Sequence, residues 1–193
     1  ENHSGGLEKS TRGRNVSVIF GDGAGAAVLS RSEEPGKGIL SSHLHSEGRH
    51  AKELVLEGPS TQRWVPEILE ANNQDDISYY PYMNGKFVFK HAITRFSEAI
   101  VEGLQANNLE KEDIDMLIPH QANLRIAQFI QKKFQLSDDK VYNNIMKYGN
   151  TTAASVIIAL TEAWELGKIK DNDLLVLAAF GSGFTWGSVI IRW

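Results

Sequence analysis

The chain has 193 residues, and its length and composition are those of one ordinary globular domain. Its formal net charge of -4 argues against a general nucleic-acid binder, and no apolar run approaches the roughly 18 residues that a membrane-spanning helix needs. The absence of cysteine excludes a disulfide, a thiolate metal site and a cysteine nucleophile within these residues. The chain opens on Glu1, without a methionine or a signal sequence, so we expect a processed protein or a piece of a longer one.

The N-terminal region predicts a loop followed by two strands. Residues 1–14 are polar and contain glycines, which is typical of a loop. Apolar strands are expected over 16–20 and 26–29, joined by the glycine-rich segment 21–25. Residues 21–26 fit the G-x-G-x-x-A form of a dinucleotide-binding fingerprint, but that fingerprint must open a helix. Because a strand is expected to follow here, we interpret the glycines as a tight β-turn.

A third strand is predicted over residues 38–45. Its side chains alternate between two faces, with Leu40 and Leu44 on one and Ile39, Ser41, His43 and His45 on the other. The two histidines share a face, with Glu47 and His50 nearby, as in part of a metal site. Because no second element supplies further ligands, we interpret the histidines as structural or surface residues.

Residues 57–85 contain three prolines and a polar run, and we predict a long excursion with one short helix over 65–71. From Phe87 onward, the apolar residues step by three or four and predict one long helix that ends at Asn107. These apolar residues are Phe89, Ile93, Phe96, Ile100 and Leu104.

The rest of the chain alternates short apolar strands with amphipathic helices, which is typical of a layered α/β fold. Strands are expected over 116–118, 174–180 and 188–191. The apolar positions of the two helices between them are Ile126, Ile130 and Phe134 in the first and Val156, Ile157, Leu160 and Trp164 in the second. A cap for the second helix is expected at residues 150–152.

An internal similarity points to a duplicated architecture. Residues 16–20 are followed by Gly-Asp-Gly and a further apolar segment, and residues 175–180 are followed by Gly-Ser-Gly and a closing strand. Only the second copy is preceded by a full set of helices and strands. We therefore expect most of the first half to lie outside this chain.

His120 and Asn150 are the strongest candidates for a catalytic role. His120 follows a buried strand and precedes a helix, and Asn150 is expected to occupy the equivalent place before the next helix. At such loops, both side chains can donate hydrogen bonds to one oxygen that gains negative charge. The alternative interpretation makes His120 a core histidine and Asn150 a helix cap.

The helix after His120 carries Arg125, Lys132 and Lys133 and no carboxylate. Arg125 and Lys132 are seven residues apart and so lie on one helix face. In an acidic chain, this face is suited to an anionic substrate or an acidic partner, although a solvated helix face is the commoner meaning of such a pattern.

Four motifs resemble the β-ketoacyl-[acyl-carrier-protein] synthase III family over about residues 16–193. They are residues 20–26, 118–126, 148–155 and 179–187, and they occur in the family's order. The resemblance implies an α/β, thiolase-like fold, in which two similar halves each hold a mixed β-sheet covered by helices. Residues 1–35 would end the N-terminal half, and residues 36–193 would form the C-terminal half.

The resemblance also implies an activity. The family uses a Cys–His–Asn set, in which His120 and Asn150 match the last two members and the cysteine lies in the half that is missing here. Full members are acyltransferases that condense an acyl group from coenzyme A with malonyl-acyl carrier protein and so initiate fatty acid synthesis. The thioester is the substrate, so neither a metal nor a further cofactor is expected. A cytoplasmic homodimer is expected.

Further residues take their expected roles from the resemblance alone. Ser182, where members usually carry glycine, would supply the backbone N–H of an oxyanion hole. Lys90 would join Arg125, Lys132 and Lys133 in binding acyl carrier protein. The remaining substrate contacts are Gly85, Ala122 and Asn123 for the pantetheine arm and Met83, Phe89, Phe180 and Phe20 for the acyl pocket.

Two other hypotheses remain open at this point. In the first, the chain comes from a related enzyme that loads a starter acyl group for a polyketide or a signalling molecule, because residues 57–82 match the family least. Alternatively, it is a non-catalytic half that serves as a structural partner. A cysteine at a strand-to-helix turn upstream would favour an enzyme, and its replacement would favour the structural partner.

Overall fold

The computed structural model describes residues 1–58 and 76–193, and the short helix expected over 65–71 lies outside them. Its centre is a sheet of four strands, in the order β1 (Gly38–Ser46), β6 (Thr185–Arg192), β5 (Leu174–Gly181) and β4 (Met116–Pro119). β4 and β5 are parallel, whereas the other neighbours are antiparallel. The sheet is therefore mixed, as the sequence predicts.

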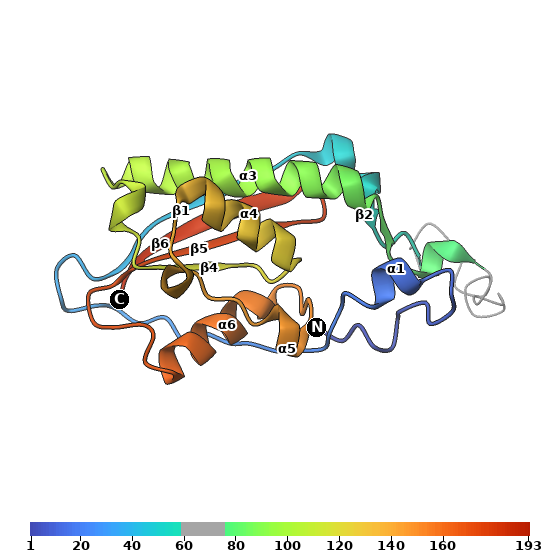
Figure 1. Cartoon of the computed structure of the whole chain (residues 1–193), viewed down its shortest axis with the longest axis horizontal. Coiled ribbons are helices and arrows are strands. Elements are labelled where there is room, and N and C mark those ends of the chain that lie inside the picture. Colours follow the sequence, from blue (N-terminus) through green and yellow to red (C-terminus); the bar gives the residue numbers. More distant parts are fainter. Residues whose placement is uncertain (59–75) are drawn as a thin grey trace.

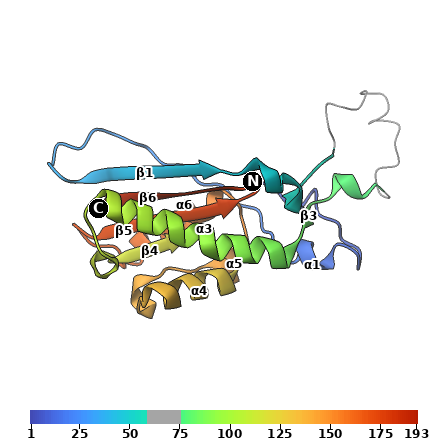
Figure 2. The same ribbon diagram turned by 90° about the horizontal axis from the view of Figure 1, so that it is seen from above.

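Helices cover both faces of this sheet (Figure 1). The long α3 (Gly85–Ala106) and α4 (Leu124–Phe134) lie on one face, and α5 (Ile145–Tyr148) and α6 (Ala154–Glu165) lie on the other. Seen from above, α3 runs along the sheet with α4 beside it (Figure 2). No helix within the described residues combines the length and the apolar character that crossing a membrane would require.

The remaining elements are short. The two-stranded ribbon of β2 (Leu54–Val55) and β3 (Tyr82–Met83) leads into the start of α3, and α1 (Arg14–Ser17) lies near the N-terminus. Single-turn or irregular 3₁₀ segments are Gly48–Glu53, Ile77–Tyr79, Lys111–Asp113 and Asp138–Lys140.

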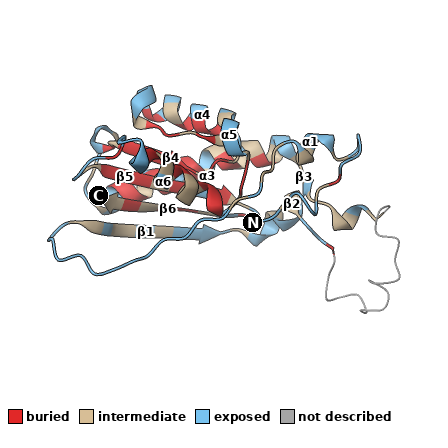
Figure 3. Cartoon of the chain, turned by 90° about the horizontal axis from the view of Figure 1, so that it is seen from below, coloured by how far each residue is buried: buried red, intermediate tan, exposed pale blue. Residues whose placement is uncertain are grey.

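The core of the molecule lies between α3, α4 and the strands, where the buried residues concentrate (Figure 3). The predicted apolar stripe of α3 is confirmed, because Phe96, Ile100 and Leu104 are buried. Gly103 brings α3 close to the sheet, since a Cβ at this position would lie 2.7 Å from Ile190 Cδ1. The side chain of Asn84 accepts from Phe87 N–H and caps the start of the helix.

The helix predicted from the apolar spacing is confirmed as α6, but its most deeply buried residues are not the large apolar ones. The residues that α6 buries are small ones, namely Ala154, Ser155, Ala159 and Ala163, whereas Trp164 is 55% exposed. Small side chains let the helix lie close to the strands, and Val156 and Leu160 pack, partly buried, against the same cluster as Ala159 and Ala163. Ile157 instead contacts the N-terminal segment, where a Cβ at Gly25 would lie 2.8 Å from its Cβ. The expected cap is also wrong, because Ala153 precedes the helix without a side-chain cap.

The N-terminal strands and the tight turn between them are not formed. Residues 14–17 are helical, Phe20 makes only a single parallel bridge to Asn150, and residues 21–33 have neither strand nor turn structure. A strand needs a neighbour to pair with, and no described strand lies beside residues 26–29. No other described segment covers these residues either, since Val28 is 96% exposed. The carboxylate of Asp22 accepts from the backbone N–H groups of His3 and Ser4, and these bonds hold the glycine segment against the first residues.

The predicted strand over 38–45 is confirmed as β1, but its alternation is not. A bulge between Ile39 and Ser41 shifts the register, so Leu40 and Ser41 are both partly buried and Leu44 is exposed. His43 and His45 both contact Glu102 of α3, and His45 Nε2 lies 2.6 Å from Glu102 Oε2. The described residues contain no cluster of three or more metal-ligating side chains.

Candidate functional site

His120 follows β4 directly, as the sequence predicts. Its backbone N–H donates to Ala178 O at 2.7 Å, which extends the parallel pairing of β4 with β5 by one residue. The imidazole Nδ1 lies 2.6 Å from Ser155 Oγ, at the start of α6. Burial lowers the pKa of the His120 imidazole to about 4, so the ring is neutral at pH 7. A neutral imidazole has one N–H, which is able to donate a hydrogen bond.

Asn150 lies between α5 and α6 and is buried. Its backbone N–H donates to Ile19 O at 2.8 Å, and its carbonyl accepts from Gly21 N–H at 3.0 Å. Its side-chain Oδ1 accepts from Thr152 N–H at 2.8 Å. This bond orients the amide so that Nδ2 is left to donate, and no described residue accepts from Nδ2.

Gln121 joins the loops that carry His120 and Asn150. It is buried, and its Oε1 accepts from the backbone N–H groups of Asn144 and Ile145, at 2.9 and 3.1 Å. Its Nε2 donates to Pro119 O at 2.7 Å and to Tyr142 O at 3.4 Å. One amide thus fixes the end of β4 against the segment that leads through α5 to Asn150.

The Asn150 loop is held from the other side by Glu162 of α6. Asn144 Nδ2 donates to Glu162 Oε2 at 2.7 Å, and Lys147 Nζ donates to Glu162 Oε1. These contacts lower the pKa of the Glu162 carboxyl, with the Lys147 hydrogen bond as the largest cause. The acid therefore stays ionised at pH 7 and ties α5 to α6.

Ser182 lies in the turn between β5 and β6, and hydrogen bonds join this turn to two neighbouring segments. Ser182 Oγ donates to Leu54 O of β2 at 2.6 Å. Phe184 N–H donates to Glu47 O at 2.8 Å, and Glu47 N–H donates to Phe184 O at 2.7 Å. No described residue accepts a hydrogen bond from Ser182 N–H. The turn is therefore fixed while one of its backbone donors remains unused.

Four of the seven residues expected to contact substrate lie together in the structure. Met83, Phe89 and Ala122 pack, partly buried, against the same core cluster that contains Phe180. Phe20 lies apart from this cluster, with its ring 4.7 Å from that of His3 and its backbone bridged to Asn150. Of the remaining two, Gly85 has open space where a side chain would be, and Asn123 caps α4 by accepting from Arg125 N–H at 2.9 Å.

The four expected basic contacts, Lys90, Arg125, Lys132 and Lys133, are exposed, and none has a carboxylate partner among the described residues. Arg125 lies in the first turn of α4, where the helix dipole disfavours a cation, so helix stability does not account for it. Lys132 and Lys133 lie in the last turn, where the dipole favours them.

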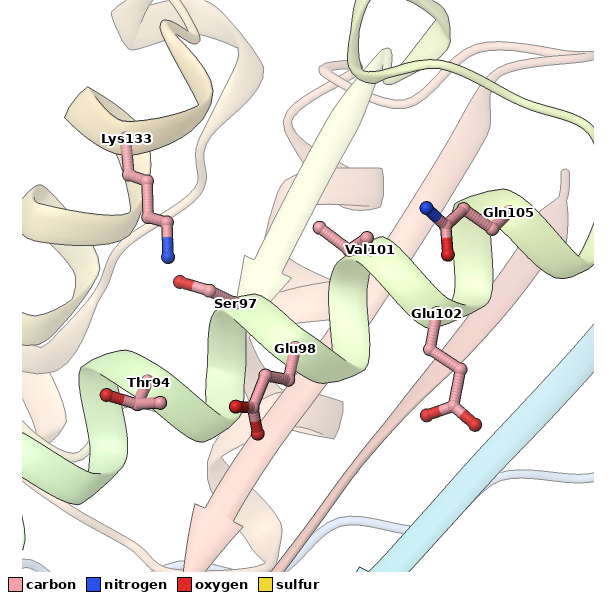
Figure 4. A pocket seen from close by; sticks show the side chains of 7 residues that line it. All are labelled: Thr94, Ser97, Glu98, Val101, Glu102, Gln105 and Lys133. Carbon is pink, nitrogen blue, oxygen red and sulfur yellow. The ribbon is translucent and has the colours of Figure 1, made fainter.

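A groove of about 320 Å³ lies between α3 and α4, away from His120 and Asn150. Its lining comes mainly from α3, including Ser97, Glu98 and Glu102, and Lys133 extends from α4 toward it (Figure 4). Lys133 therefore borders a surface that also carries two carboxylates.

The layered arrangement of a mixed sheet between helices, with functional loops at the ends of its strands, is that of the thiolase-like fold. Two family models match this chain: 3-oxoacyl-[acyl-carrier-protein (ACP)] synthase III over residues 1–48, and its C-terminal counterpart over residues 104–193. The chain belongs to the β-ketoacyl-[acyl-carrier-protein] synthase III family.

Individual relatives agree with this assignment. Beta-ketoacyl-[acyl-carrier-protein] synthase III of Salmonella typhimurium is 49% identical over 179 residues, which are 93% of this chain and 52% of the relative. The crystal structure of 3-oxoacyl-[acyl-carrier-protein] synthase III from Aquifex aeolicus has a TM-score of 0.85 and 36% identity, over 99% of this chain and 55% of that one. The crystal structure of the priming β-ketosynthase from the R1128 polyketide pathway has a TM-score of 0.77 and 28% identity, over 92% of this chain and 51% of that one. The chain spans about half the length of the curated relatives it matches.

Two residues of the site were missed by the sequence analysis. Both are buried polar residues: Gln121 contacts the loop of His120 and the segment that leads to Asn150, and Ser155 contacts His120 and Gln121. Both lie inside motifs that resemble the family, Gln121 directly after His120 and Ser155 five residues after Asn150. Their positions were visible, but their hydrogen-bond partners are distant in sequence and follow only from the fold.

Proposed function

We propose that this chain is part of an acyltransferase that condenses an acyl group from coenzyme A with malonyl-acyl carrier protein, and so initiates fatty acid synthesis. Family membership supports the reaction class. The observation that carries the proposal is the pair of oriented side chains, the neutral His120 in the loop after β4 and the Asn150 amide in the loop between α5 and α6. Residues 1–35 would complete an N-terminal half, and residues 36–193 would form the C-terminal half of a cytoplasmic homodimer.

The proposed chemistry has two stages. A cysteine outside these 193 residues takes the acyl group as a thioester and releases coenzyme A. The malonyl unit then loses carbon dioxide, and the electron pair of the broken C–C bond forms an enolate. His120 Nε2–H and Asn150 Nδ2–H donate hydrogen bonds to the enolate oxygen.

The enolate carbon next attacks the acyl thioester, and the thiolate leaves as the new C–C bond forms. Negative charge passes through the thioester oxygen, which would accept from Ser182 N–H. The unused N–H of the fixed turn supports this role, since only the backbone donor is required. The reaction needs no cofactor beyond the thioester substrate.

The 193-residue chain by itself is expected to be inactive in condensation, because it contains no thiol to carry the acyl group. The measurement is formation of 3-ketoacyl-acyl carrier protein from acyl-coenzyme A and malonyl-acyl carrier protein. The complete protein, which should also be acylated on a cysteine, is the positive control. Condensation by the purified 193-residue chain would contradict the proposal.

Arg125, with Lys132, Lys133 and Lys90, is proposed to contact the acidic acyl carrier protein, because these cations are exposed and none pairs with a carboxylate of residues 1–58 or 76–193. In the complete protein, Arg125→Glu should raise the apparent KM for malonyl-acyl carrier protein by roughly tenfold or more, since it turns attraction into repulsion. The KM for acyl-coenzyme A should change little. The effect should weaken with added salt.

Lys170→Glu is a matched control for that experiment, because Lys170 lies after α6, outside the proposed docking residues. It should leave both KM values near those of the wild type. Equal increases in both KM values for Arg125→Glu would place Arg125 at a feature that the two substrates share.

A second candidate is an enzyme that loads a starter acyl group in a polyketide or signalling pathway. The similarity to a priming β-ketosynthase of a polyketide pathway favours keeping this alternative. The two readings differ in the acyl donor and the carrier protein, so a comparison of rates with fatty acid and polyketide carrier proteins distinguishes them. A non-catalytic partner half would show no cysteine acylation with either carrier.

A further inference from the structure

The hydroxyl of Ser155 contacts two groups of the candidate site. Its Oγ lies 2.6 Å from His120 Nδ1, and it accepts from Gln121 N–H at 3.2 Å. Ser155 is only 2% exposed, and the other described residues offer its hydroxyl no further partner. The hydrogen bonds of this buried group are therefore confined to His120 and Gln121.

These contacts favour one arrangement of protons. A backbone N–H only donates, so Ser155 Oγ accepts from Gln121, and the serine proton has His120 Nδ1 as its single available acceptor. Nδ1 accepts only when it carries no proton. In the reverse arrangement, Nδ1–H donates to Oγ, and the serine O–H is left inside the protein without an acceptor, which is destabilising.

We propose that Ser155 is a positioning residue that holds neutral His120 as the Nε2–H tautomer. The imidazole then presents a donor at Nε2 and cannot accept a proton there. Donation from Nε2–H to the enolate oxygen rests on the proposed function. An imidazole protonated at Nε2 does not take a proton from a thiol through that nitrogen. The assignment of the tautomer itself rests only on the contacts of Ser155.

The first test is the tautomer, read by long-range ¹H–¹⁵N correlation spectra of the complete protein labelled with ¹⁵N-histidine at pH 7. The His120 signals are assigned by their absence in His120→Ala. The wild type should show a protonated Nε2 and an unprotonated Nδ1. Ser155→Ala should shift the proton population toward Nδ1, whereas Ser155→Thr, which keeps a hydroxyl, should retain the wild-type tautomer.

The second test is the rate of carbon dioxide release from malonyl-acyl carrier protein. Ser155→Ala should lower this rate roughly tenfold, because part of the population loses the Nε2 donor, and Ser155→Thr should restore it. Ser97→Ala is the matched control, since Ser97 is equally buried and donates to a backbone carbonyl, that of Ile93, within α3. It should change neither the tautomer nor the rate.

The two readouts separate this inference from the proposed function. A proton on Nδ1 in the wild type, or an unchanged tautomer in Ser155→Ala, would overturn the role of Ser155 whatever the activity. If the tautomer responds as expected while His120→Ala decarboxylates at the wild-type rate, the role of Ser155 stands and the proposed function of His120 is wrong.

Discussion

Replacing His120 or Asn150 by alanine in the complete protein should nearly abolish decarboxylation of malonyl-acyl carrier protein. Each variant removes one fixed donor to the enolate oxygen, and the loss of such a donor typically lowers the rate by roughly a hundredfold or more. Acylation of the cysteine by acyl-coenzyme A needs this oxygen site less and should survive better in both variants. The two half-reactions should therefore separate.

The assay follows carbon dioxide release and, in parallel, covalent labelling of the enzyme by acyl-coenzyme A. His45→Ala is a suitable control, because His45 lies on β1 and contacts Glu102 instead of the candidate site. Circular dichroism checks that each variant is folded. Wild-type decarboxylation by both folded variants would show that these two residues are wrongly assigned.

Gln121→Ala should lower the free energy of unfolding by roughly 3 kcal/mol, because the substitution leaves several buried backbone groups without partners. The N–H groups of Asn144 and Ile145 lose their acceptor, and the carbonyl of Pro119 loses its donor. The measurement is urea denaturation of the complete protein, followed by tryptophan fluorescence. Because Gln121 also fixes the loops of His120 and Asn150, decarboxylation should decline in the variant that remains folded.

Gln131→Ala provides the comparison. Gln131 also donates through its side-chain amide, to Asp138 Oδ1 at 2.7 Å, but this bond is exposed to water. The substitution should change the free energy of unfolding by no more than about 0.5 kcal/mol. Equal effects of the two substitutions would mean that Gln121 does not hold the loops together.

The long helix and the strands of the sheet were predictable because local pattern and burial agree there. The stripe from Phe96 to Leu104 repeats at helical spacing, and the same residues face the core. The strand that ends at Pro119 was also correct, and with it the placement of His120 at a strand-to-helix loop. The resemblance then supplied the roles proposed for His120, Asn150 and Ser182.

The errors arose where a distant partner decides the structure. The apolar residues 16–20 and 26–29 have the composition of strands, but strand structure requires a neighbour, and the described chain gives them none. In α6, periodicity correctly identified a helix, and Val156 and Leu160 are partly buried, but close packing against the sheet buries the small residues most deeply.

The sequence by itself determined the family, the order of the four sheet strands and of helices α3, α4 and α6, and the positions of the two candidate donors. Only the tertiary structure decided how those donors are oriented. The backbone of Asn150 is held by Ile19 and Gly21 near the N-terminus, and His120 is contacted by a serine 35 residues away. The physical reason is that a buried polar group must find its hydrogen-bond partner among the atoms that the fold brings next to it, and sequence spacing does not specify which these are.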